Sequence, residues 1–246
     1  MIKAAFFDLD GTLVDSVGGL MASMNIVMRK LGFPEITPKQ TKQYVGNGYQ
    51  VFVEKSLKAA SEKLYRKAEK AEHKNPDLAM ELEMQADDAL GAYDEACEEY
   101  LKVFSVHFLD DSDAYPGMRE TLAELRKQGI KLVCVTNKPV VATGKTLDKA
   151  FGPDYFDYVV CDDGVIPKKP DPTGCYKAME AMQVSKDEVI YLGDTKTDMV
   201  TAKNAGFLAV GCLYGFRDRK ELEENGADYL IGEPKELLKI VADLNG

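Results

Sequence analysis

The sequence has no tryptophan, only two histidines, and five cysteines that never fall at the close spacing of a metal-binding pair. The cysteines are odd in number and widely spaced, which favours buried, reduced thiols over a disulfide framework. The two histidines, His73 and His107, lie too far apart in the chain to predict a metal-binding pair. These shortages argue against a disulfide-stabilised scaffold and against a histidine metal site.

Long apolar runs and an excess of basic residues are also missing. No stretch approaches the ~20 apolar residues that span a bilayer, and the first apolar run is broken at Asp8, so it does not resemble a signal peptide. The chain has 41 acidic and 31 basic residues, a formal net charge of -10. We therefore expect a cytoplasmic protein that binds neither nucleic acid nor membranes as its main role.

Short β-type runs alternate with amphipathic helical runs over most of the chain. This alternation predicts a parallel α/β sheet covered by helices on both faces. The predicted strands are 2–7, 131–136, 158–161, 189–192, 208–212 and 229–231. The predicted helices are 118–128, 140–150, 173–182, 195–205 and 234–244.

The segment from about residue 17 to residue 108 contains no clear strand and predicts a helical insertion after the first strand. One apolar stripe at helical spacing runs from Val53 to Ala71, and a second runs from Leu78 through Leu90 and Leu101. Between them, Asn75 and Pro76 are typical of a helix start. The expected domains are an α/β core of residues 1–16 and 110–246 and a helical cap of residues 17–109.

Polar side chains gather where the predicted strands end. Asp8 and Asp10 close the first strand, Thr136 and Asn137 close the second, and Asp194 closes the fourth. The carboxyl ends of parallel strands meet at one edge, so these groups are expected to converge. Clustered carboxylates in a low dielectric require a hard cation, and oxygen ligands favour Mg²⁺.

Such a Mg²⁺ site commonly accepts substrate phosphate, whose remaining oxygens lysine and hydroxyl groups can bind. One aspartate can then attack phosphorus, and a second carboxylate two residues away can transfer the proton. The paired aspartates of "FFDLDGTLVDS" therefore predict phosphoryl transfer. Lys168 and Lys169 compete for the phosphate-facing position.

These motifs resemble those of the haloacid dehalogenase-like superfamily of phosphohydrolases over nearly the whole chain. The four matching stretches are "FFDLDGTLVDS", "VTN", "KKPDP" and "GDTKTD", in the family's order. The resemblance implies a Rossmann-like core with an inserted helical cap. It also implies Asp8 as nucleophile, Asp10 as general acid and base, and Thr136 and Lys169 as phosphate-binding groups, Lys169 being the lysine that fits the family's Lys-Pro-x-Pro pattern. The implied Mg²⁺ ligands are Asp8, the main-chain carbonyl of Asp10 and Asp194, with Asp198 as a further ligand or as a carboxylate that supports the ligands.

Within that superfamily the chain is most similar to phosphoglycolate phosphatases, so 2-phosphoglycolate is the expected substrate. Asn137 and the cap turn formed by Gly46, Asn47 and Gly48 are further candidates for substrate binding, although the turn could equally be a plain connection between helices. The alternatives are a pyrophosphate hydrolase, another sugar-phosphate phosphatase, a phosphomutase and, remotely, a non-catalytic interaction protein. The expected partner is a small phosphorylated metabolite, and the chain is expected to be a monomer or a homodimer.

Overall fold

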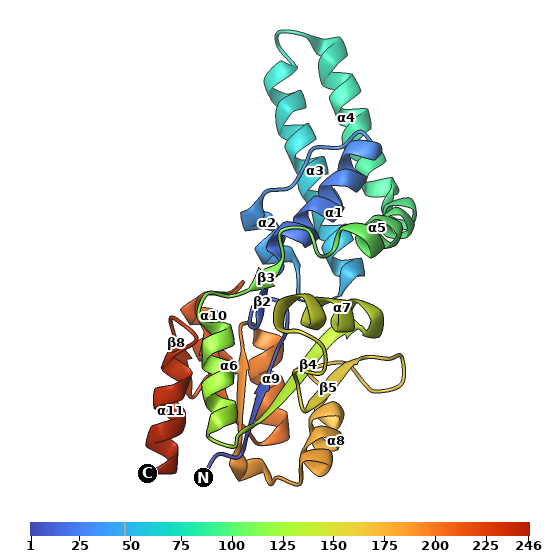
Figure 1. Cartoon of the computed structure of the whole chain (residues 1–246). Coiled ribbons are helices and arrows are strands. Elements are labelled where there is room, and N and C mark those ends of the chain that lie inside the picture. Colours follow the sequence, from blue (N-terminus) through green and yellow to red (C-terminus); the bar gives the residue numbers. More distant parts are fainter. Residues whose placement is uncertain (47) are drawn as a thin grey trace. The chain divides into compact units, whose positions relative to one another are not determined.

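The computed structural model describes residues 1–46 and 48–246 and divides the chain into two compact units (Figure 1). One unit comprises Met1–Ser16 and Ser112–Gly246, and the other comprises Val17–Asp111. The sequence placed the second boundary two residues earlier, after residue 109. Among the described residues, no helix is both long enough and apolar enough to cross a membrane.

The first unit is built on a six-stranded parallel sheet with the strand order β5-β4-β1-β6-β7-β8. The strands are β1 (Ala4–Phe7), β4 (Lys131–Pro139), β5 (Tyr158–Asp162), β6 (Val189–Gly193), β7 (Leu208–Cys212) and β8 (Tyr229–Ile231). A second, antiparallel sheet joins β2 (Val14–Asp15) to β3 (Asp113–Ala114). The predicted α/β fold with a parallel sheet is therefore confirmed.

Helices cover both faces of this sheet, because alternate residues of each strand point to opposite faces. Ala5 and Phe7 of β1 belong to one buried cluster, and Ala4 and Phe6 belong to the other. The helices of this unit are α6 (Met118–Lys127), α7 (Val140–Phe151), α8 (Thr173–Met182), α9 (Lys196–Ala205), α10 (Arg219–Glu224) and α11 (Glu236–Asn245), with a 3₁₀ turn at Lys186–Glu188.

The strand order brings the ends of β4, β1 and β6 together in the middle of the sheet. Phe7 pairs with Cys134 on one side and with Leu192 on the other. Asp8 directly follows Phe7, and Thr136 and Asp194, which the sequence also placed at a functional edge, stand two residues after Cys134 and Leu192. The one marked difference from the predicted strands is β4, which continues three residues beyond Thr136 to Pro139.

The second unit is entirely helical and comprises α1 (Val17–Lys30), α2 (Pro38–Tyr44), α3 (Tyr49–Ala71), α4 (Pro76–Gly91) and α5 (Tyr93–His107). α3 packs chiefly against α4, and α1 packs against α5. Asn75 caps α4 as predicted, accepting a hydrogen bond from the Leu78 amide at 3.2 Å.

The second apolar stripe predicted for this unit is divided between two helices, and the prediction was wrong for its leucines at 78, 90 and 101. The helix breaks at Ala92, so α4 and α5 are separate. Leu78, Leu90 and Leu101 are exposed, whereas the inward positions of α4 hold small residues. These buried residues are Ala79, Ala86 and Ala89. Alanines allow α4 to approach α3 closely, and the larger apolar residues of α4 lie on its exposed side.

Candidate active site

Asp8 lies directly after β1, at the centre of the sheet. Its amide donates to the Leu192 carbonyl at 3.0 Å, so the neighbouring strand β6 fixes its backbone. Its side chain is 12% exposed, and Oδ1 accepts from the Leu9 amide at 2.7 Å. The side chain is therefore buried and held in one orientation at a strand end.

Asp194 follows β6 and is completely buried. Oδ1 accepts from the Thr12 hydroxyl at 3.0 Å, and Oδ2 accepts from the Phe216 amide at 2.8 Å. Gly11, at a φ of +90°, packs against this carboxylate so closely that a Cβ there would lie 2.3 Å from Oδ2. The chain can turn away from β1 at this point only because residue 11 is a glycine.

Asp198 lies in the first turn of α9 and is also fully buried. Its Oδ2 accepts from the amide and the hydroxyl of Thr195, which together form the N-terminal capping box of the helix. Its Oδ1 accepts from the Lys169 ammonium at 2.7 Å. The same ammonium pairs with Asp8 Oδ1 at 2.7 Å, so one lysine bridges two carboxylates.

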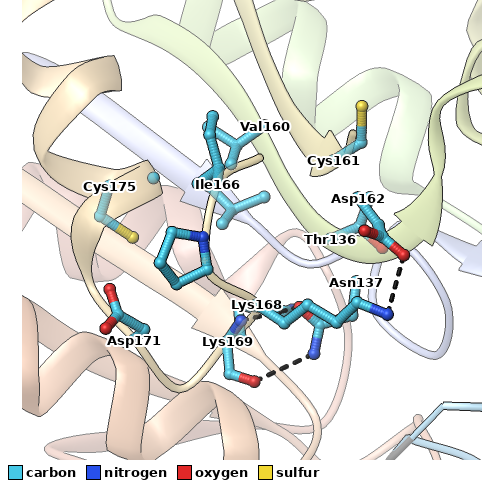
Figure 2. Close-up of a pocket in the computed structure, with 13 residues that line it drawn as sticks. Thr136, Asn137, Val160, Cys161, Asp162, Ile166, Lys168, Lys169, Asp171 and Cys175 are labelled. Carbon is cyan, nitrogen blue, oxygen red and sulfur yellow. Dashed lines mark hydrogen bonds and ion pairs between the residues drawn. The ribbon is translucent and has the colours of Figure 1, made fainter. Parts of the chain in front are cut away.

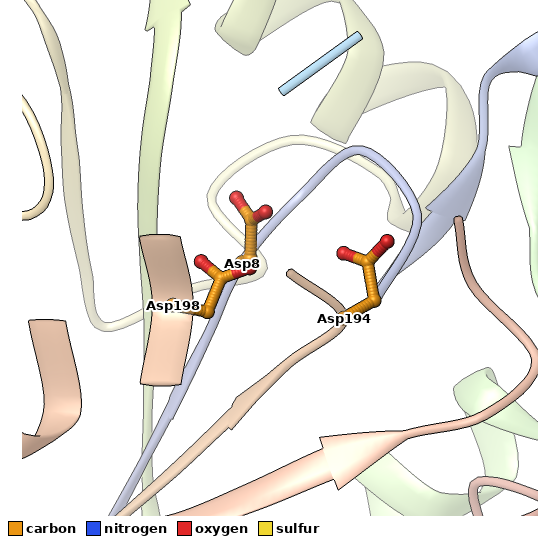
Figure 3. A group of neighbouring side chains, drawn as sticks. All are labelled: Asp8, Asp194 and Asp198. Carbon is orange, nitrogen blue, oxygen red and sulfur yellow. The ribbon is translucent and has the colours of Figure 1, made fainter. Parts of the chain in front are cut away.

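The three carboxylates lie at the carboxyl end of β1 and are buried together (Figure 3). One oxygen from each lies within 4.8 Å of the others. Burial, followed by the charge of Asp198, raises the pKa of Asp8 to about 7 against the opposing effect of Lys169. Burial also raises the pKa of Asp194 well above its usual value. The site therefore carries more negative charge than one lysine compensates.

This donor set fits a hard divalent cation. Three carboxylates supply only oxygen ligands, as Mg²⁺ requires, and a bound cation would hold all three ionised. Lys169 alone cannot do so, although its own pKa is raised well above normal because Asp198 and Asp8 outweigh the opposing effect of burial. Asp10 was predicted to contribute its main-chain carbonyl, and its carboxylate is outside this group of three.

The carboxylate of Asp10 has a separate partner that the sequence analysis missed. Lys138 Nζ pairs with Asp10 Oδ1 at 2.8 Å, and the lysine side chain is only 4% exposed. The sequence held no direct signal for this pair, because the predicted strand ended at Thr136, whereas β4 continues to Pro139 with a register shift after Val135. Each aspartate of the "DLD" pair therefore has its own buried lysine.

The two neighbouring lysines of "KKPDP" have different environments. The side chain of Lys169 is 6% exposed, whereas that of Lys168 is 55% exposed and pairs with Asp162 at 2.8 Å. Figure 2 shows this pair and the two hydrogen bonds between Asn137 and the backbone of Lys169. This geometry favours Lys169 as the functional lysine. The Asn137 side chain was predicted to contact substrate, but both of its polar atoms bond the backbone of Lys169 and hold that lysine in place.

Comparison with known proteins places the chain in a family. A family profile described as haloacid dehalogenase-like hydrolase matches residues 5–212. The chain belongs to this family. It is 33% identical to a phosphoglycolate phosphatase from Vibrio vulnificus strain CMCP6, over 98% of the chain and 96% of the relative. It is 32% identical to one from Pseudomonas putida, over 98% and 80%.

Solved structures of this family share the fold. A putative phosphoglycolate phosphatase from Lactobacillus delbrueckii subsp. bulgaricus superposes with a TM-score of 0.79 at 25% identity, covering 97% of this chain and 98% of that one. A putative haloacid dehalogenase-like hydrolase from Bacteroides fragilis gives 0.73, covering 96% and 100%. The predicted Rossmann-like core with a helical cap is thereby confirmed. With the family match and the curated relatives, the protein is assigned as a phosphoric monoester hydrolase.

Other predicted residues of this haloacid dehalogenase-like hydrolase are not brought into the carboxylate group. Thr136 is buried near the end of β4, where its hydroxyl accepts from the Lys138 amide at 3.1 Å. Gly46 and Gly48 belong to the helical unit, between α2 and α3, with φ angles of +106° and +89°. Asn47 lies outside the described residues. Substrate binding by this turn stays a prediction.

Proposed function

We propose that the protein is a Mg²⁺-dependent phosphatase that hydrolyses 2-phosphoglycolate to glycolate and phosphate through an aspartyl-phosphate on Asp8. The observation that carries the reaction type is the buried Asp8 carboxylate, bridged by Lys169 to Asp198 and close to Asp194. The substrate is taken from the names of the relatives, whose similarity extends over nearly the whole chain.

Each residue has a distinct part in the proposed reaction. Asp8 attacks phosphorus through one carboxylate oxygen as the bond to the leaving oxygen breaks. Asp10 gives its proton to that oxygen, then accepts a proton from the water that cleaves the aspartyl-phosphate and regenerates Asp8. Lys169 and the Thr136 hydroxyl stabilise the charge on the phosphoryl oxygens.

Asp8, Asp194, Asp198 and the main-chain carbonyl of Asp10 are the proposed Mg²⁺ ligands. When bound, the ion would polarise the phosphoryl group and keep the buried carboxylates ionised. Lys138 holds the Asp10 carboxylate by its 2.8 Å ion pair. The proton-transfer group is thereby kept apart from the carboxylates that would hold the metal.

A screen of phosphate compounds with the purified protein tests the substrate. Phosphate release is measured with Mg²⁺ on 2-phosphoglycolate, pyrophosphate and hexose phosphates. We expect kcat/KM to be highest for 2-phosphoglycolate and activity to stop when a chelator removes the metal. A preference for pyrophosphate or a hexose phosphate would replace the substrate, and isomerisation of a hexose phosphate would indicate a phosphomutase.

The nucleophile is tested separately with Asp8→Asn, which keeps the size of the side chain. Turnover should fall below detection while the circular dichroism spectrum is unchanged, and trapping with labelled substrate should give no protein-bound phosphate. Substantial turnover by this variant would overturn the role of Asp8. A variant that is inactive but still becomes phosphorylated would place the nucleophile elsewhere.

A further inference from the structure

The hairpin of α3 and α4 separates its charges by helix. α3 and the turn that follows it carry seven basic residues against four acidic ones. α4 carries five acidic residues and no basic one. Pairing of the two helices within the chain would be the simplest explanation, but no ion pair joins α3 to α4 in residues 49–91, all of which the structure describes. The basic residues of α3 and the acidic residues of α4 therefore do not form ion pairs with each other within the hairpin.

A group of basic residues on α3 and a group of acidic residues on α4 lie on the same side of the hairpin. Tyr65 of α3 donates to Asp87 of α4 at 2.5 Å, which marks one side. Successive residues turn about 100° around a helix. On α3, Tyr65 lies on one side of the buried stripe, and the lysines at 63, 67 and 70 lie on the opposite side. On α4, Asp87 lies on one side of the buried alanines, and Glu81 and Asp88 lie on the opposite side. We call these five residues, Lys63, Lys67, Lys70, Glu81 and Asp88, the charged face.

The register of the hairpin aligns the two sets. Because Tyr65 lies level with Asp87, the antiparallel course of the helices places Lys70 about level with Glu81 and Lys63 about level with Asp88. All four side chains are exposed. A half-turn about an axis that lies in this face, parallel to the two helices and midway between them, places the lysine stripe of one copy over the acidic stripe of the other at the same level. Such a surface is complementary to a second copy of itself, as a two-fold interface requires.

We propose that the charged face is a homodimer interface, in which α3 of one copy packs over α4 of the other. Two identical sets of lysine–carboxylate contacts would form, one on each side of the axis. The stripe from residue 63 to residue 70 is only about 10 Å long, so the interface would be small and the dimer weak. Its exposed ion pairs would make it sensitive to salt. This inference is independent of the proposed substrate and reaction.

Sedimentation velocity with charge-reversed variants tests the interface. The wild-type chain should form dimers as its concentration rises, and the dimer fraction should fall when NaCl rises from about 0.05 M to about 0.5 M. Lys63→Glu combined with Lys70→Glu should give monomers, and so should Glu81→Lys combined with Asp88→Lys. An equimolar mixture of the two variants should recover the dimer, because each heterodimer has one native and one reversed set of contacts.

The matched control reverses two acidic residues on the Tyr65 side, Glu69→Lys with Glu72→Lys, and should still dimerise. Circular dichroism checks that each variant is folded. If a double variant does not fold, the milder single variants Lys63→Gln and Glu81→Gln replace it, and each should weaken the dimer by a few-fold. A wild-type chain that stays monomeric, reversed variants that still dimerise, or a mixture that stays monomeric would each overturn the proposal.

Discussion

The charged pairs at the candidate site of the α/β unit and those along α3 of the helical unit lie in opposite environments. In the α/β unit, Lys169 and Asp198 are 6% and 0% exposed, and Lys138 is 4% exposed. In the helical unit, the pairs Lys58–Glu54 and Arg66–Glu62 are more than half exposed on both sides. Buried charges interact strongly and are costly when left unpaired, whereas exposed pairs contribute little. We therefore expect the buried charges of the first unit to carry the proposed chemistry, and the exposed charges of the hairpin to act in the proposed association.

The sharpest test of this contrast is a comparison of the two neighbouring lysines. Lys169→Met removes the ammonium that bridges Asp8 and Asp198, so kcat should fall by at least about 100- to 1,000-fold. Lys168→Met removes an exposed charge and should leave kcat within about two-fold. Steady-state kinetics on the preferred substrate of the screen measures both, and similar losses in the two variants would contradict the assignment of Lys169.

Lys138 gives the next largest expected effect. Lys138→Met releases the Asp10 carboxylate from its buried partner, so kcat should fall by about 10- to 100-fold, part of what a general acid supplies. KM should change far less, because the pair is not proposed to bind substrate. In a double-mutant cycle, adding Lys138→Met to Asp10→Asn should cause almost no further loss. Additive losses would show that Lys138 acts independently of Asp10.

Most of the first unit could be predicted from the sequence, because strands and helices alternate there and polar residues follow the strands. Asp8 and Asp194 were expected at one edge, and the structure brings them together with Asp198. The buried contacts of Lys138 and Thr12 were not foreseen. Both depend on side chains that meet across distant parts of the chain, and the predicted end of β4 at Thr136 concealed that Lys138 continues the strand.

The helical unit was less predictable for a physical reason. The large apolar residues of α3, such as Leu57 and Leu64, are buried as expected, but α4 contacts α3 through alanines. A stripe chosen by hydrophobicity therefore selected Leu78 and Leu90, which are exposed, instead of their neighbours Ala79 and Ala89. Close helix packing rewards small side chains, and hydrophobicity alone does not identify them.

Adding a methyl group at one glycine of each unit extends the comparison to packing. In Gly193→Ala, the new Cβ would lie 2.2 Å from Asp198 Cβ in a fully buried site, so overpacking should lower the free energy of unfolding by about 1–3 kcal/mol. In Gly91→Ala, at the end of α4, nothing lies within 4 Å, so stability should rise by up to about 1 kcal/mol. Urea unfolding measures both. Equal effects in the two variants would contradict the packing difference.

The smallest expected effect concerns an ion pair at the rim of the α/β unit. The hydrogen bond from Lys3 lowers the pKa of Glu188 from 4.5 to about 2. A depressed carboxyl pKa stabilises the fold above the unfolded pKa, and this contribution is lost as pH falls from about 4.5 towards 2. Glu188→Gln should therefore slightly lower the melting temperature at pH 7, and the difference from wild type should shrink towards pH 3. Glu54→Gln, from an exposed pair of α3, should cause a smaller change at either pH, and a Glu188→Gln effect that is constant with pH would exclude an ionic origin.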